Sequence, residues 1–134
     1  MAELRVIHPA DRAPAEASGP MTREAAISGA QVGAERMWVG HVTLGPGMVS
    51  AVHHHGESES TIYIIAGQAR FAAGDTLESV ADAGPGDFVW VPPHLPHVEI
   101  NLSDDLPVEM VVVRSTQEAI VVNLDAPEGW TPPR

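Results

Sequence analysis

Three consecutive histidines stand next to two carboxylates near the middle of the chain, at His53, His54, His55, Glu57 and Glu59. Apolar and small residues from position 48 onward precede them, which favours a β-strand that runs into the histidines. In a strand, side chains alternate between two faces, so His53 and His55 share one face and His54 takes the other. Two neutral imidazoles on one strand face can converge on a metal ion. The pattern therefore favours a metal site over the alternative, a solvated polar turn.

A second stretch able to do chemistry follows about forty residues later, between positions 84 and 101. A strand pattern at 87–91 ends at Pro92 and Pro93, and His94 and His97 come directly after it. Proline has no N–H to donate to a sheet ladder, so the two prolines end the strand. His94 falls in the turn that follows, and His97 begins the next predicted strand.

Together the two stretches resemble the two motifs of the cupin family. The first motif has a glycine, five residues, His-x-His, three or four residues, a glutamate and a later glycine. The second has a glycine, five residues, proline, one residue, glycine, two residues, histidine, three residues and asparagine. The matching residues, with one residue of excess before Gly67, are Gly47, His53, His55, Glu59, Gly67, Gly86, Pro92, His97 and Asn101. His94 replaces the second glycine of the second motif.

The resemblance implies an all-β fold, a small antiparallel jelly-roll (double-stranded β-helix) barrel in one domain. It also implies one divalent transition metal, held by His53, His55, Glu59 and His97. Small cupins of this kind commonly pair, so the resemblance implies a homodimer.

The position of the glutamate departs from the usual pattern. Counting forward from His55 gives Glu59, but counting back three residues from Tyr63 gives Ser60. A β-bulge at the barrel rim would reconcile the two counts. Glu57 as the carboxylate ligand and a site of three histidines alone are the alternatives.

Three residues are candidates for a catalytic role: Glu59 as a base if it does not bind the metal, His94 at the barrel mouth, and His41 if its strand turns it inward. For His94 the alternative is a tolerated turn residue, and for His41 a structural histidine. Arg70 and Arg114 are rare basic residues on apolar strands. Either can orient an anionic substrate with two parallel hydrogen bonds, or form an ordinary ion pair.

Short strands separated by turn residues must position these groups. Apolar and β-branched runs predict strands at 4–7, 37–44, 48–55, 61–65, 69–72, 77–80, 87–91, 97–102, 108–114 and 120–122. Residues 22–27 are a strand or a turn, and no long helix is expected. This spacing is typical of a sandwich or barrel. We expect an N-terminal arm with the first strands over 1–35, the barrel over 36–125 and a C-terminal tail over 126–134.

Charge and composition exclude several classes of function. The 18 acidic and 7 basic residues give a net charge of -11, which disfavours binding to nucleic acid or to anionic membranes. The absence of cysteine excludes disulfides and thiolate chemistry. No apolar run is long enough to span a bilayer and the first residues lack a signal-peptide pattern, so a cytoplasmic protein is expected.

The expected function is a small metal-dependent enzyme that acts on a chelating organic molecule. Fe(II) is the favoured metal, and Mn, Ni, Cu and Zn are compatible with the same ligands. A dioxygenase is favoured over a redox-neutral isomerase, cyclase or lyase. A non-catalytic module that binds a small molecule or a metal is the further alternative. No separate organic cofactor is expected.

Overall fold

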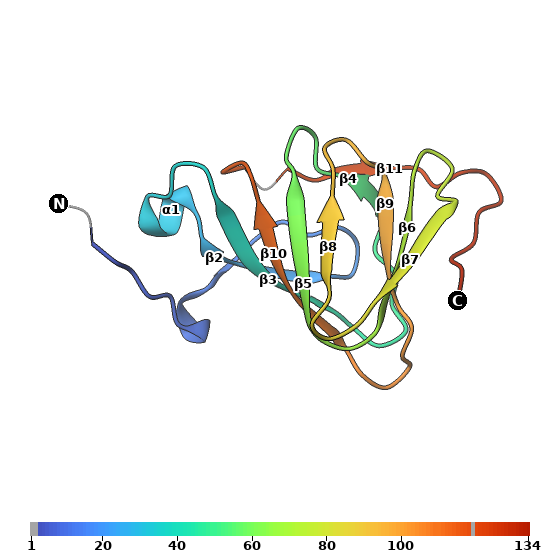
Figure 1. The fold of residues 1–134 in the computed structure, drawn as a ribbon, viewed down its shortest axis with the longest axis horizontal. Helices are drawn as coiled ribbons and strands as arrows, with labels where there is room; N and C mark the ends of the chain where they lie inside the picture. Colours follow the sequence, from blue (N-terminus) through green and yellow to red (C-terminus); the bar gives the residue numbers. More distant parts are fainter. Residues whose placement is uncertain (1–2, 119) are drawn as a thin grey trace.

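A computed structural model describes residues 3–118 and 120–134 of the chain (Figure 1). The first two residues of the expected N-terminal arm, and position 119 of the expected barrel, lie outside the described residues. The described part contains a short 3₁₀ turn, η1 (Pro9–Asp11), one four-residue helix, α1 (Gly29–Val32), and eleven strands. In this part no helix has the length and apolar character needed to cross a bilayer. The strands are β1 (Ala13–Pro14), β2 (Thr22–Ile27), β3 (Trp38–Leu44), β4 (Val52–His54), β5 (Ser60–Ala66), β6 (Ala69–Ala73), β7 (Ser79–Ala83), β8 (Phe88–Val91), β9 (His97–Asn101), β10 (Val108–Arg114) and β11 (Val122–Leu124).

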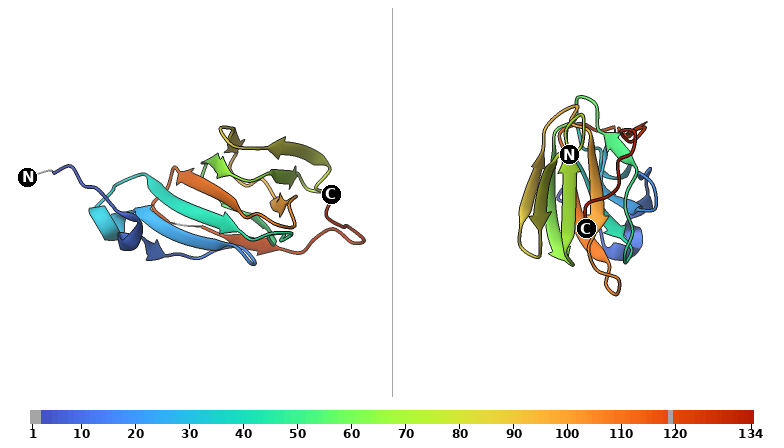
Figure 2. Two further views of the ribbon diagram at one scale, coloured as in Figure 1. Left: turned by 90° about the horizontal axis from the view of Figure 1, so that it is seen from below. Right: turned by 90° about the vertical axis from the view of Figure 1, so that its right-hand side faces the viewer.

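The strands form two antiparallel sheets that face each other (Figure 2). One sheet has the order β1-β2-β3-β10-β5-β8 and the other the order β11-β4-β9-β6-β7. Neighbours in a sheet are mostly distant in sequence, as in β3-β10-β5 and β4-β9-β6, which is the connectivity of a jelly roll. The predicted all-β jelly roll is confirmed. In the described residues, however, the ladders do not join the two sheets, so the fold is an open sandwich instead of a closed barrel.

Alternation along the central strands builds the main core between the sheets. Every second residue of β3 and β10 is buried, and Val42, Leu44, Val108 and Met110 have no exposed surface. The same alternation along β5 buries Ser60, Ile62 and Ile64. Residues of the opposite parity face away from the sandwich interior, and this fixes the direction of each polar side chain on these strands.

A second apolar cluster covers β9 from the other side. It contains Val98 and Ile100 of β9 and is covered in part by Trp130 from the C-terminal segment. All five residues of β9 are therefore buried. Because Val98 and Ile100 occupy one face, His97, Glu99 and Asn101 share the opposite face, which is turned toward the other sheet.

The predicted strands agree with the observed strands over most of the two sheets. The predicted strands at 37–44, 61–65, 69–72, 87–91, 97–102 and 108–114 correspond to observed strands within one residue at each end. The predicted strand at 48–55 is only Val52–His54, because a turn and an isolated bridge at Val49 precede it. The region 22–27 is a strand that pairs with β3. The run at 4–7 forms no strand, and β11 begins two residues later than predicted.

Asn101, the last residue of the second motif, forms hydrogen bonds to the turns at one end of the sandwich. It has no exposed surface. Its side-chain NH2 donates to the carbonyls of Leu44, Gly45 and Leu106 at 2.8–3.1 Å, and its Oδ1 accepts from the Ser103 amide at 2.9 Å. Asn101→Ala removes these partners and leaves buried backbone groups unpaired. We expect the free energy of unfolding to fall by about 2 kcal/mol in urea denaturation.

Asn123→Ala is the matched control. Asn123 lies on exposed β11 and accepts one hydrogen bond, from the Ser18 hydroxyl at 3.0 Å. Its removal is expected to cost less than about 1 kcal/mol, since water can replace that bond. Equal losses for the two variants would contradict a structural role for Asn101.

Candidate metal centre

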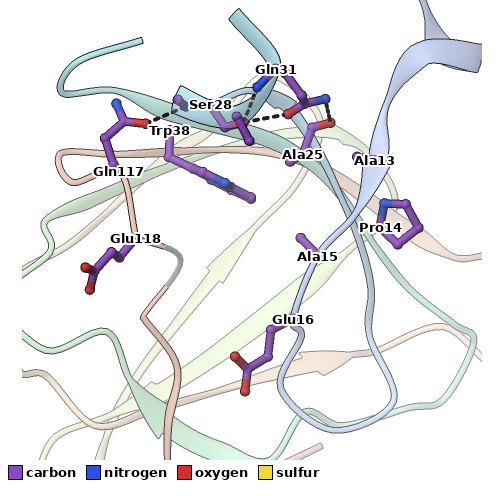
Figure 3. Close-up of a pocket in the computed structure, with 12 residues that line it drawn as sticks. Ala13, Pro14, Ala15, Glu16, Ala25, Ser28, Gln31, Trp38, Gln117 and Glu118 are labelled. Atoms are coloured by element: carbon purple, nitrogen blue, oxygen red, sulfur yellow. Dashed lines mark hydrogen bonds between the residues drawn. The ribbon is translucent and has the colours of Figure 1, made fainter. Parts of the chain in front are cut away.

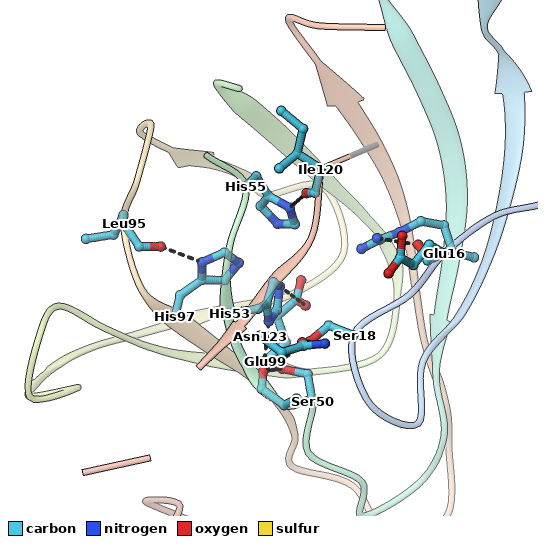
Figure 4. Close-up of polar contacts among 12 residues, drawn as sticks. Glu16, Ser18, Ser50, His53, His55, Leu95, His97, Glu99, Ile120 and Asn123 are labelled. Atoms are coloured by element: carbon cyan, nitrogen blue, oxygen red, sulfur yellow. Dashed lines mark hydrogen bonds and ion pairs between the residues drawn. The ribbon is translucent and has the colours of Figure 1, made fainter. Parts of the chain in front are cut away.

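Three histidines meet in the interior between the sheets (Figure 4). His53 lies in β4 and pairs in register with His97, the first residue of β9, and His55 directly follows β4. Their exposed fractions are 0%, 2% and 6% for His53, His97 and His55. The nitrogen atoms that can act as ligands lie within 4.8 Å of one another, one from each ring. His54, between two of them in sequence, points away, as strand alternation predicts.

Hydrogen bonds to the backbone fix the orientation and the tautomer of all three rings. The bonds join Nδ1 of His53 to the Ala51 carbonyl at 2.8 Å, Nδ1 of His55 to the Ile120 carbonyl at 2.7 Å, and Nδ1 of His97 to the Leu95 carbonyl at 2.9 Å. A carbonyl can only accept, so each Nδ1 carries the proton and each Nε2 keeps its lone pair. Nε2 of His53 and of His97 is buried and has no hydrogen-bond partner among the described residues.

Burial keeps two of these rings neutral. Loss of solvation lowers the pKa of His53 to about 2, helped by the neighbouring His97 ring and opposed by the hydrogen bond to Ala51. Loss of solvation, followed by the positive charge of Arg114, lowers the pKa of His55 to about 3. Only a neutral imidazole can bind a metal ion. The buried lone pairs on Nε2 of His53 and His97, which have no partner in the described part of the chain, therefore fit a divalent transition metal. The other nitrogen of each ring, Nδ1, is already hydrogen-bonded to a backbone carbonyl.

A model of the family described as "Cupin domain" matches residues 40–114, which is more than half of the chain. The chain belongs to the cupin family. The matched region runs from β3 to the end of β10 and includes all three histidines. No curated protein sequence matches this cupin significantly.

Solved structures with the same fold include enzymes of different chemistry. The polyketide cyclase RemF from Streptomyces resistomycificus superimposes with a TM-score of 0.74 at 22% identity, over 94% of this chain and 89% of that one. Oxalate decarboxylase from Lactobacillus farciminis has a TM-score of 0.74 at 21% identity, over 87% of this chain. This cupin spans only 35% of that decarboxylase. At these identities the likeness establishes the fold alone.

The structure does not bring Glu59, the fourth predicted ligand, together with the three histidines. Glu59 is exposed, and its carboxylate accepts a hydrogen bond from the Trp90 indole N–H at 2.7 Å. The reason is strand parity: Ser60 begins β5 and is buried, so the residue before it faces outward. Glu57 is also exposed. Of the alternatives left open by the sequence, the three-histidine group is the one that this geometry supports.

Replacement of Glu59 by glutamine is expected to leave the affinity for Zn(II) unchanged within about twofold, because its carboxylate is hydrogen-bonded on the outer surface. Competition with a chromophoric chelator measures this affinity. A loss of tenfold or more would mean that the loop before β5 rearranges to bring Glu59 to the metal.

The other two catalytic candidates lie outside the histidine cluster. His41 is on the face of β3 opposite to buried Gly40 and Val42, so strand parity turns it away from the interior, and the geometry favours the structural alternative. His94 is exposed, adopts the left-handed conformation with φ of 60°, and donates its backbone N–H to the Gly56 carbonyl at 2.8 Å. This backbone conformation explains why a glycine is favoured at that place in the motif. The His94 ring lies 5.9 Å from the His54 ring on the outside.

Glu99 is a buried carboxylate that the sequence interpretation missed. It is 4% exposed, and one carboxylate oxygen lies 3.8 Å from Nε2 of His53. Reciprocal bonds with Ser50 hold its backbone: the Glu99 amide donates to the Ser50 hydroxyl at 2.9 Å and the Ser50 amide donates to the Glu99 carbonyl at 2.8 Å. Its signal in the sequence is its position two residues after His97, which places both side chains on one face of a strand.

The two arginines singled out from the sequence have different surroundings. Arg70 forms a two-point ion pair with Asp82, at 2.6 and 2.9 Å, which is the ordinary role. Arg114 is 1% exposed and has no carboxylate within ion-pair distance among the described residues. A second buried arginine, Arg23 in β2, was not singled out. It donates to the Glu16 carbonyl at 2.7 Å.

Proposed function

We propose that this cupin is an enzyme that holds one divalent transition metal with His53, His55 and His97 and acts on a small chelating organic molecule. One observation carries the proposal. All three Nδ1 atoms are hydrogen-bonded to backbone carbonyls, so the lone pairs of the three Nε2 atoms are available as metal ligands within one buried cluster. When bound by three neutral imidazoles, such a metal keeps open positions and acts as a Lewis acid toward a carbonyl or hydroxyl group.

Residues around the histidines supply a base and an entrance. Glu99 holds an unpartnered carboxylate oxygen beside His53, where it can accept a proton from a bound substrate. A cavity of about 200 Å³ reaches His97 between β7 and β8, with Phe71 and Trp90 in its wall. The apolar wall excludes water from one side of the substrate, and the small volume selects a compact molecule.

The buried carboxylate favours redox-neutral chemistry, in which a proton is removed next to a carbonyl, as in an isomerase, cyclase or lyase. The names of the structural neighbours, a cyclase and a decarboxylase, agree with this choice by analogy only. A dioxygenase, the class favoured by the sequence, is the second candidate, because a three-imidazole site also suits Fe(II).

Exchange of substrate protons with solvent tests the proposal. Untagged protein is loaded with Mn(II), Zn(II) or Fe(II) and incubated with pyruvate in D2O, and deuteration of the methyl group is followed by NMR. We expect exchange that requires the metal and is lost in Glu99→Gln, whereas Glu59→Gln exchanges like the parent. Oxygen consumption by the Fe(II) form without methyl exchange would favour the dioxygenase. A preparation that takes up no metal under any condition would reject both.

A further inference from the structure

Two buried guanidinium groups face the interior from the six-stranded sheet. Arg114 ends β10 in the same inward row as Met110 and Val112, and its register partners are Trp38 and Ser60. Arg23 is 4% exposed and lies on β2. None of the three guanidinium nitrogens of Arg114 has a hydrogen-bond partner among residues 3–118 and 120–134.

The guanidinium of Arg114 packs over the face of Trp38. The guanidinium carbon lies 5.0 Å from the centre of the indole ring. Gly40 makes room for that indole, because a Cβ at Gly40 would clash with the ring. A cation–π contact leaves the in-plane N–H groups of the guanidinium free. Arg114 therefore keeps its five donors, whose geometry matches a carboxylate.

The charges buried around the histidines do not balance. Arg23 and Arg114 contribute two positive charges, Glu99 contributes one negative charge, and a divalent metal would add two more positive charges. Burial lowers the pKa of Arg114 to about 9, with the charge of Arg23 as the next cause and Glu99 opposing both. The three groups are thus close enough to interact, in a chain whose net charge is -11. An anionic ligand would restore the balance that the protein itself does not provide.

A cavity of about 440 Å³ is lined by Trp38, which stacks on Arg114, and by Glu16, whose carbonyl binds Arg23 (Figure 3). The two arginines themselves do not line it, so the cavity adjoins their contacts. The Glu16 side chain is exposed, so water screens its charge. The volume is within the range of small-molecule sites.

We propose that Arg114, supported by Arg23, binds the carboxylate of a small organic acid whose second oxygen group reaches the three-histidine centre. The substrate class is therefore an anionic chelator such as a 2-oxo or 2-hydroxy acid. This inference rests on the proposed metal-dependent function, since the second oxygen group is assigned to the metal.

Calorimetric titration with pyruvate and with its uncharged amide, pyruvamide, tests the inference on Zn(II)-loaded and metal-free protein. We expect Arg114→Met to lose at least tenfold in affinity for pyruvate and to bind pyruvamide like the parent. Arg114→Lys keeps the charge but loses the planar pair of donors, and an intermediate loss is expected. Arg70→Met, which removes an arginine already paired on the surface, is the matched control and should stay within twofold.

The outcomes separate this inference from the proposed function. If Arg114→Met and Arg114→Lys bind Zn(II) and pyruvate as the parent does, the arginine site is overturned and the metal proposal stands. If the parent takes up no Zn(II) but binds pyruvate in an Arg114-dependent way, the metal proposal fails and the anion site is supported. Failure of the parent to bind pyruvate at millimolar concentration also overturns the arginine site. Circular dichroism of each variant verifies the fold.

Discussion

Replacement of His97 by alanine is expected to lower the affinity for Zn(II) by a factor of about 60 to 700 while the jelly roll stays folded. Structural zinc sites with four ligands are worth about 10–16 kcal/mol, so one ligand contributes about 2.5–4 kcal/mol, and each 1.4 kcal/mol is a factor of ten. His97 is the right residue to change because its ring comes from a different strand than His53 and His55. Without its ring, all the remaining ligands come from His53 and His55 of one strand segment. Competition with a chromophoric chelator measures the affinity, and urea denaturation verifies the fold.

His54→Ala is the matched control for this prediction. His54 is adjacent in sequence to two of the proposed ligands, but it is half-buried on the other face, where its Nδ1 accepts from the Gly56 amide at 2.9 Å. Its substitution is expected to change the affinity less than threefold. If His54→Ala and His97→Ala weakened Zn(II) binding equally, the argument from strand alternation would be wrong. Binding would then depend on a loose histidine-rich surface.

The parts of the site that the sequence predicts are those set by local geometry. Alternation within one strand is a property of neighbouring residues, so the direction of His53, His54 and His55 follows from their spacing. The same rule predicts which residues of β3, β5 and β10 face the interior. The apolar and β-branched residues of these segments predict that they are strands. The fold class is predictable for this reason, and because proline and glycine mark the turns between strands.

The structure departs from the sequence interpretation where a turn resets the alternation or where partners are distant in the chain. Between His55 and Ser60 the chain leaves one sheet and enters the other, so counting residues from the histidines cannot tell which way Glu59 points. Arg23 becomes an interior residue only because β2 pairs with β3, a contact that depends on the whole sheet. The alternation of side chains along a strand, counted from His97, would have predicted that Glu99 shares the inward face. Glu99 was missed because the family motif assigns no role to that position.

The buried rings of His53 and His55 are expected to make the stability of the metal-free protein sensitive to acid. The pKa values of His53 and His55, about 2 and 3, lie far below the ordinary value of 6.5 that applies after unfolding. Below pH 6.5 the unfolded chain therefore binds more protons than the folded one, and stability falls as the pH falls. Each group removes about 2 kcal/mol by pH 5, so the free energy of unfolding is expected to drop by about 4 kcal/mol between pH 8 and pH 5. Urea denaturation at a series of pH values in the presence of a chelator measures this drop.

His53→Gln separates this contribution from general acid denaturation. The variant lacks one of the two rings that must stay neutral, so the pH dependence of its stability is expected to decrease by about one proton, which is about half of the combined effect. NMR of the imidazole protons in the folded parent gives a direct reading. Both rings should remain neutral down to about pH 4, in line with pKa values of about 2 and 3. Titration of both rings near pH 6.5 in the folded protein would mean that they are hydrated. A hydrated site would lack the dry, pre-oriented lone pairs on which the metal centre depends.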